Sequence, residues 1–257
     1  MSGKLYLVPN TLDFGVATHA EGSSGQPDLQ QVLPLEVIRI AARLPCWVAE
    51  NAKTTRAFLK RVNEVVPLSQ ALQAISIVEL PRSNKGAPQT PAANLGALLA
   101  PAIAGQDMGL ISEAGLPAVA DPGAALVQAA HALNVRVEAL SGPSSLMLAL
   151  AASGLNGQSF AFVGYLPVDS AARLTRIREL EALSRKTQQT QLMIETPYRN
   201  AALLAALLSA LSGATRLSVS CGLTLEQGWS RTDTVSGWKA RSIEIPSDTP
   251  AVFSLLA

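Results

Sequence analysis

The sequence predicts an α/β protein of two domains, an N-terminal domain on a parallel sheet and a C-terminal domain on a mixed sheet. In the first half, short apolar segments alternate with longer segments of helical periodicity, which is the pattern of βαβ units. In the second half, strand-like segments outnumber the helices, which indicates antiparallel pairing. The 257 residues are 48% hydrophobic, so the chain is able to bury a large core.

Five strands and four helices are expected in the first half. The strands are expected at 5–8, 46–49, 75–78, 108–112 and 135–140, and the helices at 32–43, 54–63, 91–104 and 123–133. Strand, helix and strand at this spacing favour parallel strands with helices on both faces. Pro101 is expected to kink the third helix or end it early, and Gly105 is expected just beyond its end.

The second half is expected to hold five strands and only two long helices. The strands are expected at 160–164, 190–195, 216–221, 229–235 and 251–256, and the helices at 171–185 and 200–212. Asn200 is the expected N-cap of the last helix, and Gly213 the expected residue beyond its C-terminus. The number of predicted helices for each predicted strand falls beyond residues 141–143. This change predicts domains at 1–142 and 143–257.

Composition excludes several classes of protein. The longest apolar runs, 146–152 and 201–208, are far shorter than the roughly 18 residues of a membrane span, and no signal segment is expected. Two distant cysteines, Cys46 and Cys221, define neither a disulfide framework nor a metal site, which favours a cytoplasmic location. The net charge of +1 provides no global field toward nucleic acid.

The common catalytic motifs are also missing from the sequence. There is no Walker loop, no G-x-G-x-x-G fingerprint and no nucleophile elbow. The only histidines, His19 and His131, lie in a loop-like segment and a helical one. Zinc catalysis and Ser–His or Cys–His chemistry therefore lack their usual residues, and no metal is expected.

Four loops each follow directly after a predicted strand. They are residues 9–11, 50–56, 112–123 and 141–145, and they are rich in polar side chains, glycine and proline. The carboxyl ends of parallel strands meet at one edge of a sheet, which is where α/β proteins bind ligands. The sequence therefore predicts a site at this edge, although each loop taken singly is also explained as a turn.

An ordered series of motifs runs through the chain. The motifs are Ser112-Glu-Ala-Gly-Leu-Pro-Ala-Val-Ala-Asp-Pro-Gly, Gly142-Pro-Ser-Ser, Ala152-Ser-Gly-Leu, Gly164-Tyr-Leu-Pro and Ile194-Glu-Thr-Pro-Tyr-Arg. This series resembles the S-adenosylmethionine-dependent methyltransferases of the tetrapyrrole methylase superfamily, nearest to the branch of small-subunit ribosomal RNA methyltransferase I, which methylates a ribose hydroxyl. The resemblance covers nearly the whole chain. It implies two α/β domains, S-adenosylmethionine in the cleft between them, and a homodimer.

The resemblance also implies roles for particular residues. The expected cofactor contacts are Pro9, Glu113, Leu116, Ser144, Ser145, Ile194, Glu195, Pro250 and Ala251. A hydroxyl acceptor benefits from a base, and the carboxylates near the expected cleft are Glu50, Glu113, Asp121 and Glu195. Of these, Glu50 and Glu113 are the candidate catalytic carboxylates. Arg56, Tyr198 and Arg199 are the candidate substrate contacts.

Two of these assignments have a purely structural alternative. Ser144 and Ser145 precede an apolar run and are also explained as a helix cap. Glu195 and Arg199 are four residues apart and are also explained as an ion pair on a helix.

A basic segment at 171–186 is open to two interpretations. It carries Arg173, Arg176, Arg178, Arg185 and Lys186, with Leu174, Ile177, Leu180 and Leu183 expected on one buried face. The first interpretation is a solvated amphipathic helix. The second is a helix that contacts the phosphates of an RNA.

Three functions are therefore kept in view. The first is a methyltransferase that acts on RNA, at a ribose. The second is a methyltransferase of a tetrapyrrole or another small molecule, but the tetrapyrrole branch usually has a Gly-x-Gly-Pro-Gly loop where this chain has Pro9-Asn10-Thr11. The third is a non-catalytic cofactor-binding module of the same fold.

Overall fold

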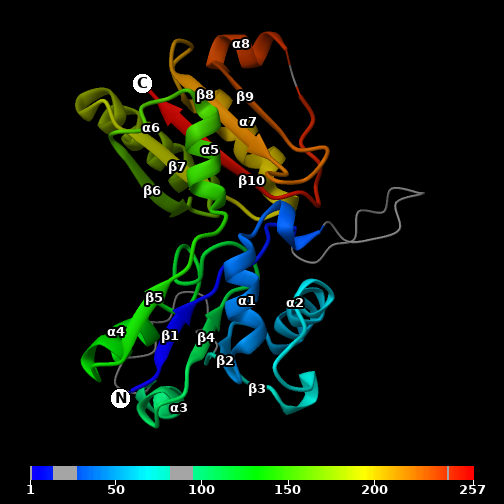
Figure 1. Ribbon diagram of the computed structural model, residues 1–257. Helices are drawn as coiled ribbons and strands as arrows, with labels where there is room; N and C mark the ends of the chain where they lie inside the picture. The colour runs from blue at the N-terminus through cyan, green and yellow to red at the C-terminus, as the bar shows by residue number, and fades with distance from the viewer. Residues whose placement is uncertain (1, 14–27, 82–94, 242) are drawn as a thin grey trace. The chain divides into compact units, whose positions relative to one another are not determined.

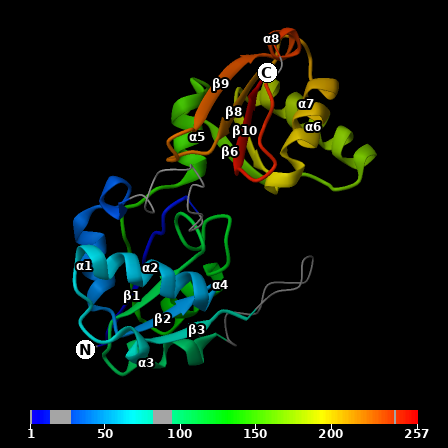
Figure 2. The same cartoon turned by 90° about the vertical axis from the view of Figure 1, so that its right-hand side faces the viewer.

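The computed structural model describes residues 2–13, 28–81, 95–241 and 243–257. The chain divides into two compact units, Met1–Ser144 and Ser145–Ala257, and each unit is built on a five-stranded sheet (Figures 1 and 2). In the described segments, every helix is too short or too polar to cross a bilayer.

The sheet of the first unit is parallel throughout its described strands, as predicted. Its order is β3-β2-β4-β1-β5, with β1 at Lys4–Leu7, β2 at Cys46–Ala49, β3 at Ser76–Glu79, β4 at Met108–Ile111 and β5 at Arg136–Ala139. Leu5 of β1 is in register with Met108 on one side and Val137 on the other. All residues of β2 and β4 are buried, which is expected of central strands covered on both faces.

The helices of the first unit lie between its strands, as expected, with shifted ends. They are α1 at Leu35–Arg43, α2 at Ala52–Val65, α3 at Ala100–Ile103 and α4 at Ala124–Ala132, with 3₁₀ turns η1 at Leu29–Gln31, η2 at Leu72–Ala74 and η4 at Gly96–Leu99. α1 begins at Leu35 rather than at residue 32, because Pro34 has an extended conformation and forms its N-cap.

The helix expected at 91–104 does not end early at Pro101, but it changes from the 3₁₀ turn η4 to the α-helix α3 directly before this residue. Pro101 lies in the first turn of α3, where its missing N–H has no helical partner to lose, and the preceding turn η4 is 3₁₀. Gly105 follows the helix with a φ of 94°, the left-handed conformation that glycine adopts freely. Residues 91–94, the expected start of this helix, lie outside the described residues.

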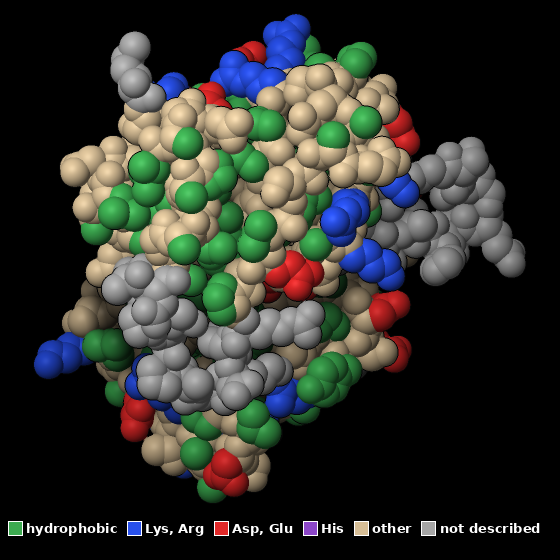
Figure 3. All heavy atoms as spheres, turned by 90° about the horizontal axis from the view of Figure 1, so that it is seen from below, with side chains coloured by type: hydrophobic (Ala, Val, Ile, Leu, Met, Phe, Trp, Pro, Cys, Tyr) green, Lys and Arg blue, Asp and Glu red, His purple; other side chains and the backbone are tan. Residues whose placement is uncertain are grey.

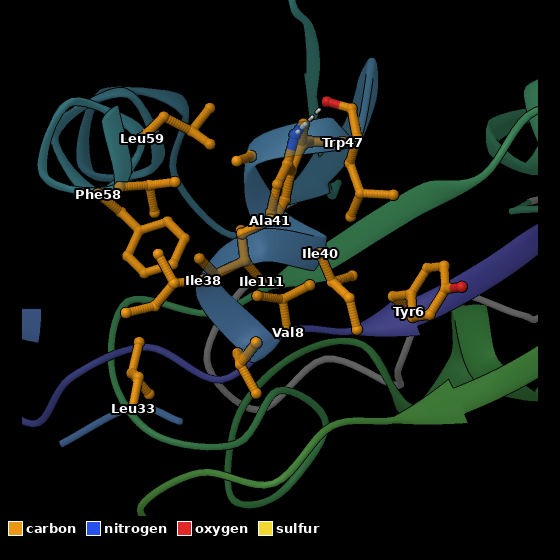
Figure 4. Packing of buried hydrophobic residues seen from close by; sticks show 14 of the residues in the cluster. Tyr6, Val8, Leu33, Ile38, Ile40, Ala41, Trp47, Phe58, Leu59 and Ile111 are labelled. Atoms are coloured by element: carbon orange, nitrogen blue, oxygen red, sulfur yellow. Dashed lines mark hydrogen bonds between the residues drawn. The ribbon is translucent and has the colours of Figure 1, made fainter. Parts of the chain in front are cut away.

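One face of this sheet packs against α1 and α2 around Trp47 (Figure 4). The indole N–H of Trp47 donates to the Leu44 carbonyl over 3.3 Å, and its ring meets the edge of Phe58 at 6.4 Å between centroids. The opposite face packs against η4, α3 and α4 through a second apolar cluster that includes Leu110 and Leu126. Both faces are therefore closed, and the ends of the strands are left for a site.

The sheet of the second unit is mixed, as predicted. Its order is β6-β7-β10-β8-β9, with β6 at Phe160–Tyr165, β7 at Thr190–Ile194, β8 at Arg216–Cys221, β9 at Trp229–Thr234 and β10 at Ala251–Leu256. β6 and β7 are parallel, and the other neighbours are antiparallel.

The helices of the second unit depart from the prediction in several places. They are α5 at Ser145–Ser153, α6 at Ser170–Thr187, α7 at Asn200–Ala210 and α8 at Val235–Ala240, with the 3₁₀ turn η5 at Pro197–Arg199. α6 and α7 cover one face of the sheet and α5 packs on the other (Figure 1). α8 was not expected from the sequence, and α5 was anticipated only through the helix cap offered as the alternative role of Ser144 and Ser145.

The expected caps of α7 were wrong at both ends. Asn200 is the first residue of the helix, and its side-chain amide donates to the Thr249 carbonyl over 3.0 Å instead of capping. The helix ends at Ala210 with Leu211 in an extended conformation, so Gly213 lies too far along the chain to terminate it.

The buried face of α6 was predicted in part, and Leu174, which was expected on it, is only half-buried. Ile177 and Leu180 are buried as expected, but Leu183 is 42% exposed. The buried face continues instead through Glu181 and Ser184, which follows the 3.6-residue period of a helix rather than a spacing of three. The Glu181 carboxylate accepts hydrogen bonds from Ser212 N (2.8 Å) and from the Thr215 hydroxyl.

Candidate functional site

The loops after β1, β4 and β5 meet at the carboxyl edge of the first sheet, as predicted. The Asn10 N–H donates to the Gly115 carbonyl over 2.9 Å and the Gly115 N–H to the Thr11 carbonyl over 3.4 Å. A β-carbon on Gly142 would lie 2.2 Å from the Pro9 β-carbon, so only glycine permits this approach of the β5 and β1 loops.

The main chain of Glu113 is held on both sides at this edge. Its N–H donates to Oε2 of Glu50, which follows β2, over 3.0 Å. Its carbonyl accepts from Nδ2 of Asn10 over 3.0 Å, and the same amide group donates to the Ser112 carbonyl over 3.2 Å. The loop after β2 therefore joins the other three, and both predicted catalytic carboxylates, Glu50 and Glu113, lie at this edge.

Burial and mutual repulsion perturb the acidic groups here. Burial, followed by the charge of Glu50, raises the pKa of Asp121 from its ordinary 3.8 to about 7, against a lowering by the Ser112 hydroxyl. Burial also raises the pKa of Glu50, to which the charge of Glu113 adds, while the Glu113 N–H opposes it. A carboxyl group with a pKa near neutrality is suited to accept and return a proton.

The loop that carries Glu113 and Asp121 contains unusual backbone conformations. Ala118 and Ala120 have φ values of 67° and 62°, and Gly115 and Gly123 also have positive φ. Left-handed conformations at residues with a β-carbon cost about 1–3 kcal/mol each and gather at functional sites. The strain supports the interpretation of 112–123 as a ligand loop rather than a simple connection.

The other candidate site residues of the first unit differ in their burial. Pro9 is buried and Leu116 is half-buried in the strained loop, whereas Arg56 is exposed on α2 and donates to the Ala52 carbonyl over 3.4 Å. Ser144 immediately precedes α5, and Ser145 opens it. The structure therefore places both serines at a helix start, in agreement with the structural alternative.

In the second unit, the candidates gather at the ends of β7 and β10. Ile194 closes β7 and pairs with Val252, while Ala251 opens β10 directly after Pro250. Glu195 follows Ile194, and its side chain is 1% exposed.

The ion pair between Glu195 and Arg199, the structural alternative for these residues, is present, although its carboxylate is buried. Oε1 of Glu195 accepts from Nη2 of Arg199 over 2.7 Å and from Thr196 N over 2.7 Å. Tyr198 is 70% exposed, with the Arg199 guanidinium 5.4 Å from its ring centroid. Tyr198 is thus an exposed ring beside the half-buried guanidinium of Arg199, which the buried carboxylate of Glu195 holds in place.

The basic segment of α6 is partly neutralised. Arg176 pairs with Glu179 at 3.0 Å and Arg185 approaches Glu181 at 3.8 Å, while Arg178 and Lys186 are exposed. On the face drawn in Figure 3, Lys and Arg side chains stand among acidic and hydrophobic ones rather than forming a single basic field.

Sequence reasoning missed the residues that join these loops. Nothing local marks the Asn10 side chain as a clamp, and the ion pair of Asp13 with Arg61 joins positions far apart in the chain. His19 lies outside the described residues. In the segments that the structure describes, no three His, Cys, Asp or Glu side chains are arranged to hold a metal ion.

Comparison with known sequences agrees with this architecture. Residues 27–234 match the family model described as Tetrapyrrole (Corrin/Porphyrin) Methylases. Two relatives, each named Ribosomal RNA small subunit methyltransferase I, come from Mesorhizobium japonicum and Xylella fastidiosa and are 41% and 38% identical over 127 and 117 residues. The matches cover 49% and 46% of this chain, and 42% and 41% of the relatives, so the chain spans less than half the length of these curated relatives.

Solved structures share the fold over nearly the whole chain. Uroporphyrin-III-C-methyltransferase from Thermus thermophilus is 19% identical with a TM-score of 0.52, covering 100% of this chain and 93% of its own. A structure of the Thermus thermophilus enzyme complexed with S-adenyl homocysteine is 17% identical with a TM-score of 0.50, covering 99% and 97%. At this identity the likeness establishes the fold of two α/β units.

Proposed function

Because the chain belongs to the tetrapyrrole (corrin/porphyrin) methylase family, we propose that it is a methyltransferase that takes its methyl group from S-adenosylmethionine. The observation that carries the proposal is the acidic edge of the first unit, where Glu50, Glu113 and Asp121 follow the strands of a family-matched fold. The Thermus thermophilus structure complexed with S-adenyl homocysteine supports the choice of cofactor.

The chemistry of this edge fits such a cofactor. S-adenosylmethionine carries an electrophilic methyl group on a cationic sulfur, together with ammonium and ribose hydroxyl donors. Carboxylates accept hydrogen bonds from those donors, and a bound cation would relieve the repulsion that adds to burial in raising the pKa of Asp121. We propose as cofactor contacts Pro9, Glu113, Leu116 and Ser144 of the first unit, and Ser145, Ile194, Glu195, Pro250 and Ala251 of the second.

The protein's contribution to catalysis would be alignment and proton transfer. Methyl transfer is a direct displacement, in which fixed orientation removes up to ~7–11 kcal/mol of entropic barrier. Glu50 and Glu113 are the proposed catalytic carboxylates, and Asp121, with a pKa of about 7, is suited to take the proton of a hydroxyl acceptor at neutral pH. A base of this kind contributes roughly 10²–10⁴-fold to the rate.

We propose RNA, methylated at a ribose hydroxyl, as the substrate. The names of the curated relatives support this choice. Tyr198 offers an exposed ring for stacking, and Arg199 and Arg56 offer positive charge for phosphates. A tetrapyrrole acceptor is the second candidate, which the family description and the solved structures support.

A homodimer and a cytoplasmic location complete the proposal. Exposed aromatic side chains on the edge strand β6, which include Phe160 and Phe162, support an apolar contact with a second copy. Ribosomal RNA as a substrate supports the cytoplasm. Sedimentation equilibrium at micromolar concentration checks the dimer, and a single 26.8 kDa species would contradict it.

Thermal shift with S-adenosylhomocysteine tests the cofactor. A ligand that binds only the folded protein stabilises it by about 2.7 kcal/mol at a hundredfold excess over its Kd. We expect a higher Tm with S-adenosylhomocysteine than with NAD or ATP, and equal behaviour of all three would reject the assignment. Mass spectrometry of ribosomal RNA nucleosides from a strain lacking the protein then tests the substrate, with the loss of one methylated ribose as the expected result.

A further inference from the structure

A buried ion pair fastens the β1 loop to helix α2. Nη2 of Arg61 donates to Oδ2 of Asp13 over 3.0 Å, and Nη1 donates to Oδ1 of Asp13 over 3.3 Å and to the Thr11 hydroxyl over 3.2 Å. The Thr11 hydroxyl in turn donates to Oδ1 of Asp13 over 2.6 Å. The side chains of Arg61 and Asp13 are only 8% and 6% exposed.

These contacts continue into the loop that carries Glu113. The Thr11 N–H donates to Oδ1 of Asn10 over 2.9 Å, which fixes the amide that donates from its other end to the Ser112 and Glu113 carbonyls. The Glu113 N–H then donates to Glu50.

Helix α2 closes this series into a ring. Glu50 directly precedes Asn51, whose side chain caps α2 by accepting from Lys53 N over 2.9 Å and Thr54 N over 3.3 Å. Arg61 lies further along the same helix. The ring therefore runs from Glu50 through α2 to Arg61, across the β1 loop to Glu113, and back to Glu50.

The energetics of the pair favour a positioning role over a stabilising one. Removing two charges from water costs several kcal/mol per ion, and well-packed apolar side chains often serve stability as well or better. What a bidentate guanidinium–carboxylate pair adds is a fixed geometry. Here that geometry sets where the β1 loop lies against the main chain of Glu113.

We propose that Arg61 and Asp13 are positioning residues that hold Glu113 in its cofactor-binding geometry, an inference that rests on the proposed function. Neither side chain needs to touch the cofactor. Their effect passes through Thr11 and Asn10 to the Glu113 peptide.

The test separates position from stability with a double variant. Arg61→Met alone removes the guanidinium from beside the buried carboxylate of Asp13. The single variant therefore combines a loss of stability with a loss of loop position. Asp13→Leu/Arg61→Met removes both charges and is expected to have a Tm closer to the wild type than either single variant. Leu59→Ala, a cavity in the core of the same helix, is the matched control because it lowers the Tm without touching the ring.

Two measurements decide the result. Calorimetric titration with S-adenosylhomocysteine should show a Kd raised about tenfold or more in the double variant and near the wild-type value in Leu59→Ala. Residue-resolved hydrogen exchange without ligand should show faster exchange of the Glu113 and Gly115 amides in the double variant alone. Wild-type protection of both amides in the double variant would overturn the inference.

Failure of the proposed function gives a different pattern. If the wild type does not bind S-adenosylhomocysteine, the cofactor assignment fails, while faster exchange still establishes that the pair positions the loop. If the double variant binds S-adenosylhomocysteine with the wild-type Kd, the inference that Arg61 and Asp13 position a cofactor contact is refuted. The proposed function is unaffected by that result.

Discussion

The Glu113 N–H donates to the carboxylate of Glu50 over 3.0 Å, so the main chain of one acidic residue stabilises the charge of another. Burial raises the pKa of Asp121, and the charges of Glu50 and Glu113 raise it further, with Glu50 contributing more than Glu113. Three acids thus share a partly buried edge with one backbone donor between two of them, and burial together with the neighbouring charges favours the protonated form of Asp121.

Asp121→Asn is expected to change how stability depends on pH. The pKa of Asp121 is raised in the folded protein, so the folded state binds this proton more tightly than the unfolded chain. The free energy of unfolding therefore gains from Asp121 below its ordinary 3.8 and loses that gain as pH rises to about 7. Asp121→Asn should flatten this part of the curve, measured by urea unfolding between pH 4 and pH 8. Glu64→Gln, an exposed carboxylate of the same unit, is the control, and parallel curves for Asp121→Asn and the wild type would contradict the prediction.

Arg199→Met is expected to lower the free energy of unfolding by about 1–3 kcal/mol, because it removes the guanidinium donors from the buried carboxylate of Glu195. Arg176→Gln breaks an exposed ion pair with Glu179 at a cost of about 0–1 kcal/mol and is the matched control. Chemical denaturation measures both. Equal losses would show that the burial of Glu195 has no energetic weight.

Substitution of Leu180 should lower the free energy of unfolding far more than substitution of Leu183, which lies on the same helix α6. Leu180 is fully buried, so Leu180→Ala should cost about 2–5 kcal/mol through the removal of apolar packing and the cavity it leaves. Leu183→Gln, at an exposed position, should stay within about 0.5 kcal/mol of the wild type. Comparable losses in urea unfolding would mean that a partner covers Leu183 in solution.

The triple variant Arg173→Gln/Arg176→Gln/Arg178→Gln tests whether α6 contacts RNA. If it does, RNA binding should weaken, and the salt slope should fall by roughly one unit for each phosphate that an arginine no longer neutralises. The affinity for S-adenosylhomocysteine should stay unchanged. Lys239→Gln on α8 controls for the loss of positive charge alone. Wild-type RNA affinity and slope in the triple variant would remove α6 from the RNA surface.

Local pattern was enough to locate the strands but not every helix. The apolar runs at 46–49 and 251–256 coincide with β2 and β10, because short buried strands bounded by loops have a clear signature. α5 was anticipated only through its possible cap at Ser144 and Ser145, because its residues 146–152 are apolar on every side, which removes the amphipathic period. Leu183 was misplaced because a spacing of three drifts away from the buried face of a helix.

At the candidate site, the meeting of the loops was predictable from local sequence patterns, whereas contacts between side chains far apart in the chain were not. Loops that follow parallel strands were expected to meet, and the contacts of Asn10 with Gly115 and of Glu50 with Glu113 confirm it. The partner of Asp13 was not predictable, because Arg61 reaches it only once α2 has folded onto the sheet. Burial likewise sets the pKa of Asp121, and burial belongs to the tertiary structure.

The position of β1 in its sheet bears on how the protein folds during synthesis. Among the described strands β1 pairs with β4 and β5, so Leu5 gains its first neighbour only after Met108 has left the ribosome and its second only after Val137 has. Pairings so distant in sequence close slowly. Among the described central strands, β1 is therefore the last to gain neighbours on both sides, and the loop that carries Asn10 and Asp13 follows this strand. A chain released before β5 is complete would expose its apolar first strand to chaperones or to aggregation.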